Sequence, residues 1–305
     1  MEKTLITVFT PTYNRIKLLP QCYESLKRQT CRDFLWLIVD DGSSDGTGDL
    51  VAKWMAEEKD FAIQYISKPN GGLHTAYNAA IEAAETELMV CVDSDDYLTD
   101  TAIERIARCW NSRDDASAAG IVALNQNQDA QILGHRLPEL EREHLITLYC
   151  QYSCRSDLKM IYRTDLLKRE GPIPAFEHEK YMNPYYLFLK IDQKLPMLLL
   201  NEPVCVVNYQ ADGMSTSIVY QYVQSPRSFA ALRRMMVSME GASAPYVFKN
   251  SVHLVSSALL AKDLSLLKGL PRKGVLALAF LPGVLLCMAI KLLVRKGTGR
   301  EKAWK

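Results

Sequence analysis

Four short apolar segments alternate with segments of helical spacing over the first 92 residues of this 305-residue chain. The apolar segments, which contain many β-branched or aromatic residues, are residues 5–10, 34–39, 61–66 and 88–92. The segments between them that show helical spacing are residues 16–29, 46–58 and 73–84. Strands separated by helices of this length pair in parallel through right-handed crossovers. The sequence therefore predicts an α/β fold with a mostly parallel sheet flanked by helices.

Polar residues follow each predicted strand at its carboxyl end. They are Thr-Pro-Thr-Tyr-Asn-Arg at 10–15, Asp-Asp-Gly-Ser-Ser-Asp-Gly at 40–46, Asn-Gly-Gly at 70–72 and Asp-Ser-Asp-Asp at 93–96. Ligands of open parallel sheets collect beyond the carboxyl ends of the strands. We therefore expect these four loops to build one binding site.

The last of these loops places three carboxylates within four residues, directly after a buried strand. Holding like charges this close is costly unless a cation offsets them, and hard oxygen ligands suit Mg²⁺ or Mn²⁺. Asp93 and Asp95 could both reach one ion if the chain stays extended there. An Asp-x-Asp sequence alone is more often a solvated acidic turn. The three polar loops upstream favour the metal site.

In their order and spacing, the four motifs resemble those of family 2 inverting glycosyltransferases with the GT-A fold, in particular a non-processive bacterial polysaccharide-type branch. The resemblance covers residues 3–115 and extends more weakly to about residue 215. It implies an enzyme that uses a nucleotide-sugar donor, with a UDP-sugar expected, and a divalent ion, Mn²⁺ or Mg²⁺. It also implies transfer of one sugar, with inversion, to a hydroxyl group of a glycan or lipid-linked acceptor.

The resemblance assigns roles to individual residues. Asp95 would hold the metal ion, and Asp93 would assist it or hold the ribose. Asp41 would accept a hydrogen bond from the nucleotide base, whereas Asp40 is expected to bond the backbone of its own turn. Arg15 either approaches a phosphate or is a surface residue at the start of a helix. The other residues that the resemblance places at the donor are Thr10, Pro11, Tyr13, Asn70, Gly71, Gly72, Asn78 and Ser94.

Inverting transfer also needs a base that removes the proton of the acceptor hydroxyl, usually a carboxylate. The family often supplies it from a Glu-Asp pair, which the second half of this chain lacks. Residues 176–181 read Phe-Glu-His-Glu-Lys-Tyr instead, like a branch of the family with Glu-x-Glu-Lys in that place. The resemblance makes Glu179 the first candidate for the base and Glu177 the second. The alternative is a charged loop before a helix over residues 185–191.

The sequence divides into a predicted catalytic domain, residues 1–225, and a helical extension, residues 226–305. The catalytic domain would comprise a nucleotide-sugar half to about residue 115 and an acceptor half from about residue 116. Helices are expected at 228–239 and 247–267. Gln-Ser-Pro-Arg-Ser at 224–228 lacks the tryptophan of the Gln-x-x-Arg-Trp element of processive synthases, which favours addition of one sugar per encounter.

The extension contains an uncharged run, residues 275–290, that Pro282 and Gly283 interrupt. From Lys268 onward lie nine of the 36 basic residues and only one of the 35 acidic residues. Because a spanning helix needs about 20 apolar residues, we favour a re-entrant or interfacial anchor over residues 270–300 that touches anionic lipid. A helix packed on the domain and a true membrane span are the alternatives.

The remaining features limit the expected cellular location of the protein and its class of function. The N-terminus lacks the pattern of a secretory signal, and the eight cysteines include no Cys-x-x-Cys pair, which favours reduced thiols. We expect a cytoplasmic protein at the inner face of the cell membrane. The uncharged stretch of the tail fits lipid better than nucleic acid, so no nucleic-acid partner is expected. The rival functions are a nucleotidyltransferase on a related sheet and a non-catalytic nucleotide-sugar-binding module.

Overall fold

The computed structural model describes residues 4–112, 117–154, 157–208, 210 and 218–296, which form two compact units. The sheet unit comprises Met1–Gly71, Thr75–Pro172 and Lys194–Tyr209. The helical unit comprises Gly72–His74, Ile173–Gln193 and Gln210–Lys305. This grouping differs from a single boundary at residue 225, because two earlier segments pack with the C-terminal helices.

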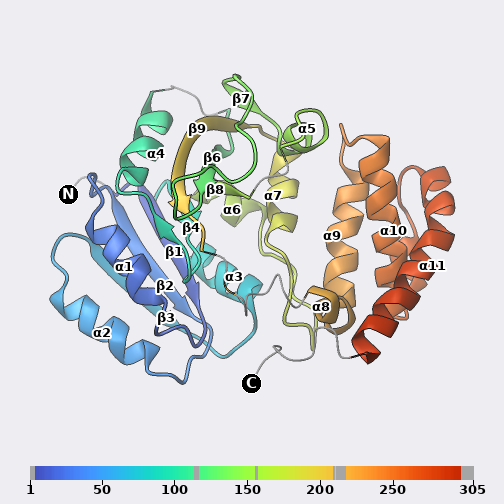
Figure 1. Cartoon of the computed structure of the whole chain (residues 1–305), viewed down its shortest axis with the longest axis horizontal. Coiled ribbons are helices and arrows are strands. Elements are labelled where there is room, and N and C mark those ends of the chain that lie inside the picture. The colour runs from blue at the N-terminus through green and yellow to red at the C-terminus, as the bar shows by residue number, and fades with distance from the viewer. Residues whose placement is uncertain (1–3, 113–116, 155–156, 209, 211–217, 297–305) are drawn as a thin grey trace. The chain divides into compact units, whose positions relative to one another are not determined.

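The sheet unit is built on a nine-stranded sheet in the order β3-β2-β1-β4-β8-β6-β9-β5, with β7 paired to β9 (Figure 1). Strands β3, β2, β1 and β4 are parallel, whereas β8 lies antiparallel between β4 and β6. The predicted α/β fold with a mostly parallel sheet is confirmed. The strands are β1 (Ile6–Thr12), β2 (Phe34–Asp40), β3 (Ala62–Ser67), β4 (Leu88–Cys91), β5 (Tyr97–Leu98), β6 (Gly120–Gln126), β7 (Arg142–Glu143), β8 (Leu158–Arg163) and β9 (Met197–Val206).

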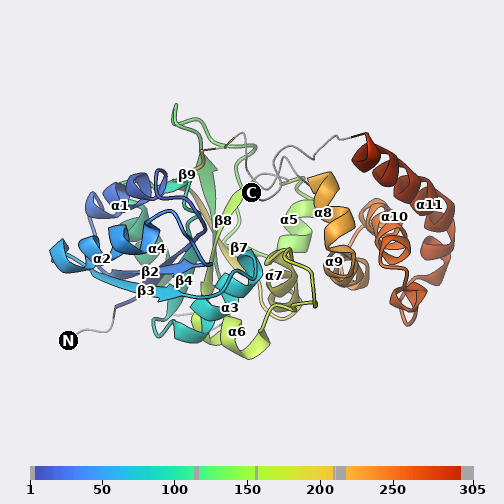
Figure 2. The same cartoon turned by 90° about the horizontal axis from the view of Figure 1, so that it is seen from below.

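Helices cover both faces of this sheet. Figure 2 shows α1, α2 and α4 on one side of the strands and α3 and α6 on the other. The first side encloses a core in which Trp36 of β2 packs near Tyr23 of α1 and Trp54 of α2. On the other side Phe9 of β1 makes an edge contact with Tyr77 of α3. The helices are α1 (Leu19–Lys27), α2 (Thr47–Glu57), α3 (Leu73–Ala83), α4 (Ala102–Asn111), α5 (Leu145–Cys150) and α6 (Thr164–Glu170).

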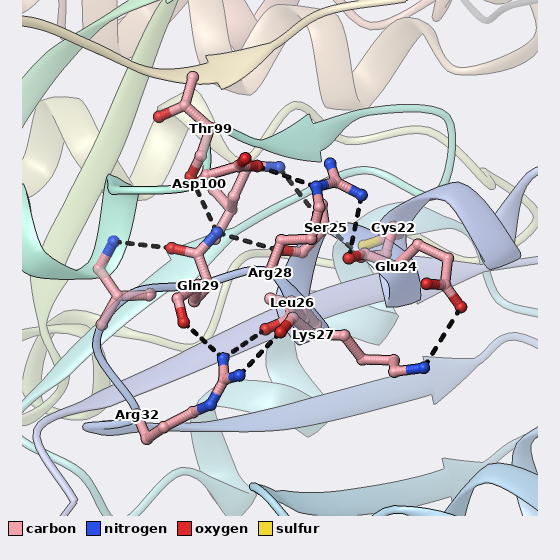
Figure 3. A network of polar contacts seen from close by, with 12 residues as sticks. Cys22, Glu24, Ser25, Leu26, Lys27, Arg28, Gln29, Arg32, Thr99 and Asp100 are labelled. Carbon is pink, nitrogen blue, oxygen red and sulfur yellow. Dashed lines mark hydrogen bonds and ion pairs between the residues drawn. The ribbon is translucent and has the colours of Figure 1, made fainter.

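A polar network joins the end of α1 to the turn before α4 (Figure 3). The buried Gln29 amide donates to the carbonyls of Ser25 and Thr99, and its oxygen accepts the Ile103 N–H. Arg28 pairs with Asp100 beside it at 3.0 Å. Because the turn starts just after the acidic loop at 93–96 and strand β5, this network fixes one end of that loop on the sheet unit.

The helical unit contains α7 (Tyr185–Asp192), α8 (Ile218–Gln224), α9 (Pro226–Ser238), α10 (Ala244–Leu260), the short 3₁₀ helix η2 (Leu264–Leu267) and α11 (Lys273–Arg295). The expected interruption at Pro282 and Gly283 is wrong, because α11 runs through both residues as one helix of 23 residues. A proline inside a helix removes one backbone donor. The packing of α11 along α10 compensates for this lost backbone donor. Gly283 allows the two helices to approach closely at Val255.

Candidate active site

The first two motif loops are bonded directly to each other. The Asn14 amide oxygen accepts the Ser44 N–H at 2.8 Å, and Ser43 Oγ accepts the Asn14 N–H at 2.8 Å. Asn14 has φ 50, a left-handed conformation that asparagine tolerates better than most residues. Asp45 binds the Ile16 N–H at 3.0 Å and the Thr47 hydroxyl at 2.6 Å. The loops after β1 and β2 are therefore joined by hydrogen bonds at one edge of the sheet, as their placement in the sequence predicts.

Asp41 joins the second loop to the third. Its buried carboxylate accepts hydrogen bonds from Lys68 Nζ, from the Asn70 amide at 3.1 Å and from the Gly71 N–H at 3.0 Å. Lys68 also donates to the Thr75 hydroxyl at 2.8 Å. The sequence analysis did not single out Lys68, although a lysine at the end of a strand beside an acidic loop was a signal. Asp41 thus holds the Asn-Gly-Gly turn in place.

Asp40 has the structural role expected of it. Its carboxylate accepts the Ser43 N–H at 2.7 Å and the Tyr65 hydroxyl proton at 2.7 Å. It therefore bonds the backbone of its own turn and ties β2 to β3.

The residues expected at the nucleotide differ in how deeply their side chains are buried. Thr10 is fully buried, and its hydroxyl accepts the indole N–H of Trp36 at 2.9 Å, so its side chain lies in the core instead of at the loop edge. Pro11 and Ser94 are also buried, while Tyr13, Arg15 and Asn78 are half-buried. Arg15 is close enough to Asp95 to stabilise its ionised form.

The acidic loop brings the carboxylates of Asp93, Asp95 and Asp96 close together after strand β4. Asp93 is exposed and Asp95 half-buried at the surface. Burial raises the pKa values of both carboxyls, and neighbouring carboxylates add to the rise, whereas Lys159 opposes it at both residues and Arg15 also opposes it at Asp95. For Asp93 these neighbours are Asp95 and Asp157, and for Asp95 the neighbour is Asp96. A cation bound beside the two carboxylates would favour their ionised form.

Asp96 and Lys159 form a buried ion pair beneath this loop. Lys159 Nζ lies 3.7 Å from Asp96 Oδ2, and the other Asp96 oxygen accepts the Asn208 N–H at 3.1 Å. Burial raises the pKa of Asp96 to about 6. The charge of Lys159 opposes this rise, and the charge of Asp93 adds to it. The sequence analysis missed Lys159. The signal was a charged residue in an apolar strand, on the same face as the buried Ile161.

We expect Lys159→Met to lower the free energy of unfolding by roughly 3 kcal/mol, because removing one partner leaves a buried carboxylate uncompensated. Chemical denaturation measures the change. Lys53→Met, at an exposed lysine of α2, should stay within about 0.5 kcal/mol. Adding Asp96→Asn to Lys159→Met should recover part of the loss, since the two charges depend on each other. Strictly additive losses would contradict a coupled pair.

The donor set at the loop suits a hard divalent ion. Asp93 and Asp95 supply two carboxylates, whereas Asp96 is already bonded to Lys159 and Asn208. Within the described part of the chain, no three His, Cys, Asp or Glu side chains form a ready-made metal group. Mg²⁺ is usually held by one or two carboxylates together with substrate phosphates and water. The residues present therefore fit such an ion.

Glu179, the first candidate for the base, caps a helix. Its two carboxylate oxygens accept the backbone N–H groups of Arg227 at 2.9 Å and Ser228 at 2.7 Å, in the first turn of α9. The unpaired N–H groups and the dipole at a helix N-terminus favour a carboxylate there. Glu177 is 84% exposed and lies 3.2 Å from His178. The two glutamates thus occupy different environments.

Gly72 packs against the segment that carries Glu179. It has φ +93, and a Cβ atom built on it would lie 2.0 Å from the carbonyl oxygen of Lys180. Only glycine fits both this conformation and this approach. The positive φ expected in the Asn-Gly-Gly turn is confirmed at Gly72.

Gly72→Ala should therefore destabilise the protein by at least about 2 kcal/mol, because both the backbone and the Lys180 carbonyl must shift. The melting temperature provides the measurement. Gly274→Ala is the matched control, because nothing lies within 4 Å of its added Cβ and alanine favours a helix more than glycine does. Equal stability of the two variants would show that the turn tolerates a side chain.

Known proteins resemble this chain in sequence. The chain is 28% identical over 237 residues to hyaluronan synthase of Pasteurella multocida, which covers 76% of this chain and 23% of that protein. It is 27% identical over 281 residues to chondroitin synthase of Pasteurella multocida strain Pm70, covering 87% of this chain and 28% of that protein. The chain spans about a quarter of the length of these relatives.

Solved structures share the fold. TarS 1–349 of S. aureus in complex with UDP-GlcNAc superposes with a TM-score of 0.60 at 17% identity, over 96% of this chain and 92% of that one. The mannosyltransferase PcManGT from Pyrobaculum calidifontis, in complex with GDP-Man and Mn²⁺, gives a TM-score of 0.56 at 18% identity, over 98% and 88%. The predicted GT-A fold is therefore confirmed.

Residues 7–171 match the family described as glycosyl transferase family 2. The match includes the four motif loops and the buried Lys159 of β8. Because it covers more than half of the chain, this protein belongs to glycosyl transferase family 2 and is a glycosyltransferase.

Proposed function

We propose that this enzyme moves one sugar from a nucleoside diphosphate sugar, with UDP as the nucleotide, to a hydroxyl group of a glycan or lipid-linked acceptor. The transfer inverts the anomeric carbon and serves the synthesis of a bacterial surface polysaccharide. The observation that carries this proposal is the loop at 93–96, where burial and neighbouring carboxylates raise the pKa values of Asp93 and Asp95, an arrangement that a bound cation would stabilise.

Different motif loops contact different parts of the donor. Asp41 receives a hydrogen bond from the nucleotide base while it holds Asn70 and Gly71 in their turn. Arg15 contributes a planar cation to the diphosphate. The names of the relatives and the UDP-GlcNAc bound to TarS support a nucleotide-sugar donor.

Asp93 and Asp95 hold the divalent ion, Mn²⁺ or Mg²⁺. When bound, the ion offsets the charge that develops on the departing nucleoside diphosphate. Asp96 and Lys159 keep the loop folded beneath these ligands. Glu179 accepts the proton of the acceptor hydroxyl, with Glu177 as the alternative base.

The C-terminal helix α11 supports the proposed location. Helix α11 is long and apolar enough to cross a membrane by length and composition, the one helix of the described residues that passes this test. We propose that residues 270–300 contact the inner face of the cell membrane, which would bring the enzyme to a lipid-linked acceptor.

A ligand screen tests the donor. The full chain is heated with UDP-GlcNAc, UDP-glucose, UDP-glucuronate or GDP-mannose, with and without Mn²⁺. A donor at 100 times its Kd adds about 2.7 kcal/mol of stability, and we expect this shift for one UDP-sugar only with Mn²⁺. Transfer should release a nucleoside diphosphate. Release of pyrophosphate would indicate a nucleotidyltransferase, and no shift or binding heat with any donor would refute the proposal.

A further inference from the structure

Helix α11 has two faces of different character. Its buried residues, Ala279, Gly283, Cys287 and Ile290, lie along α10. On the rest of its surface are five apolar residues at alternating spacings of three and four. This outer stripe consists of Leu278, Leu281, Leu285, Met288 and Leu292, which are 73%, 67%, 57%, 56% and 53% exposed. A continuous exposed apolar stripe of this length is typical of an interaction surface.

The inner face fixes α11 to α10. A Cβ atom on Gly283 would lie 2.5 Å from the Val255 side chain, so the two helices touch at this point. Helix α10 also holds the buried polar side chains of Asn250 and Ser251 and exposes Lys249. If α11 crossed a membrane, it would either lose this contact or draw a charged residue toward the hydrocarbon, which is costly. The packing therefore opposes a spanning arrangement.

The charges of α11 identify the partner. Lys273 begins the helix, and Lys291, Arg295 and Lys296 lie at its other end, while residues 273–295 contain no acidic side chain. A second copy of α11 on the stripe would bring basic residues together in either orientation, because both ends are positive. An anionic lipid surface attracts both ends at once.

We propose that α11 lies parallel to an anionic membrane surface, with the outer stripe inserted among the lipids and the inner face still packed on α10. This inference rests on the membrane contact proposed above and specifies its geometry. Interfacial helices of this kind bury their apolar face about 5–10 Å deep. The helical unit thus binds the membrane peripherally, without a segment that crosses it.

Vesicle flotation tests the surface. The full chain is mixed with vesicles of phosphatidylglycerol and phosphatidylcholine, or of phosphatidylcholine alone, without any sugar donor. We expect binding to the anionic vesicles, weaker by roughly fivefold for each basic residue removed. Leu281→Gln with Leu285→Gln should weaken binding at least about tenfold. Leu264→Gln, at a 54% exposed leucine of η2, should bind like the unsubstituted chain.

Depth-dependent quenching tests the orientation. Tryptophan replaces Leu278, Leu285 or Leu292 one at a time, and quenching by lipids brominated at known depths is compared with that of the unsubstituted protein. The first and last positions are separated by about 21 Å along the helix axis, at 1.5 Å per residue. Equal depths at all three positions are expected, whereas a graded depth would show a span and overturn the proposal.

Two further outcomes would also overturn it. One is equal binding to neutral and anionic vesicles. The other is a lipid-free dimer that the Leu281→Gln, Leu285→Gln variant abolishes, because the stripe would then bind a second copy. The glycosyltransferase proposal is tested separately, since this variant should still bind the nucleotide sugar in solution. Loss of vesicle binding with intact donor binding therefore affects only the membrane inference.

Discussion

Glu179→Gln should lower kcat by about 10²–10⁴-fold, because the amide cannot take the proton of the acceptor hydroxyl. Donor binding should be spared, since the substitution leaves the loops at 10–15, 40–46, 70–72 and 93–96 unchanged. The rate is measured at saturating donor and acceptor, and donor affinity is measured by calorimetry with Mn²⁺. Normal turnover would remove Glu179 from the chemistry.

The helix cap makes a second measurement necessary. Because Glu179 accepts two N–H groups of α9, Glu179→Ala should also cost about 1–2 kcal/mol of stability. Glutamine retains one acceptor oxygen and should lose less. If Glu179 is the base, kcat falls equally in both variants. If Glu179 only caps the helix, the substitutions lower stability but leave kcat of the folded protein unchanged.

Glu177→Gln is the matched control. Glu177 belongs to the same segment, but it is exposed and pairs only weakly with a solvent-facing histidine. It should leave both stability and kcat unchanged. A large loss of kcat in Glu177→Gln, with normal turnover in Glu179→Gln, would transfer the role of the base to Glu177.

The first half of the fold was predictable because its strands are continuously apolar and its loops carry turn residues. The strand expected at 34–39 is β2 (Phe34–Asp40), and the helix expected at 73–84 is α3 (Leu73–Ala83). Buried parallel strands leave this pattern in the sequence. By contrast, β8 pairs antiparallel between β4 and β6. Such an insertion depends on contacts between distant segments, which a local pattern does not contain.

The site was predictable only in part. The sequence placed Asp41, Asp93 and Asp95 at one edge because parallel strands end together. It did not reveal that the hydroxyl of Thr10 is bonded to Trp36 in the core, since a threonine at the end of a strand can face either side. The pairing of Lys159 with Asp96 joins residues 63 positions apart. Pairings of that kind follow from the tertiary structure.

The same limit applies at α11. Pro282 and Gly283 predict a break by local rules, and the helix continues because α10 lies against it. The tertiary contact that overrides the local preference also divides α11 into an inner and an outer face. The resulting stripe could not be read from residues 275–290 alone, which are uncharged on every side.

Asp95→Asn should abolish metal-dependent turnover, with a loss of at least about 10³-fold in kcat, while it makes the metal-free protein more stable. The stability gain follows because the pKa of Asp95 is raised by burial and by Asp96. The ionised carboxylate therefore opposes folding, and a neutral amide of the same size does not. The loss of rate follows because an amide cannot supply the charge that holds a divalent ion, whose contribution is several kcal/mol.

Melting curves with and without Mn²⁺ separate these two effects. Without metal, Asp95→Asn should melt higher than the unsubstituted chain. With Mn²⁺ and the donor, the unsubstituted chain should gain stability and Asp95→Asn should gain little. Asp129→Asn, at an exposed carboxylate outside the motif loops, should match the unsubstituted chain in both conditions. A lower melting temperature of metal-free Asp95→Asn would show that this carboxylate supports the fold, and that its raised pKa does not reflect a missing cation.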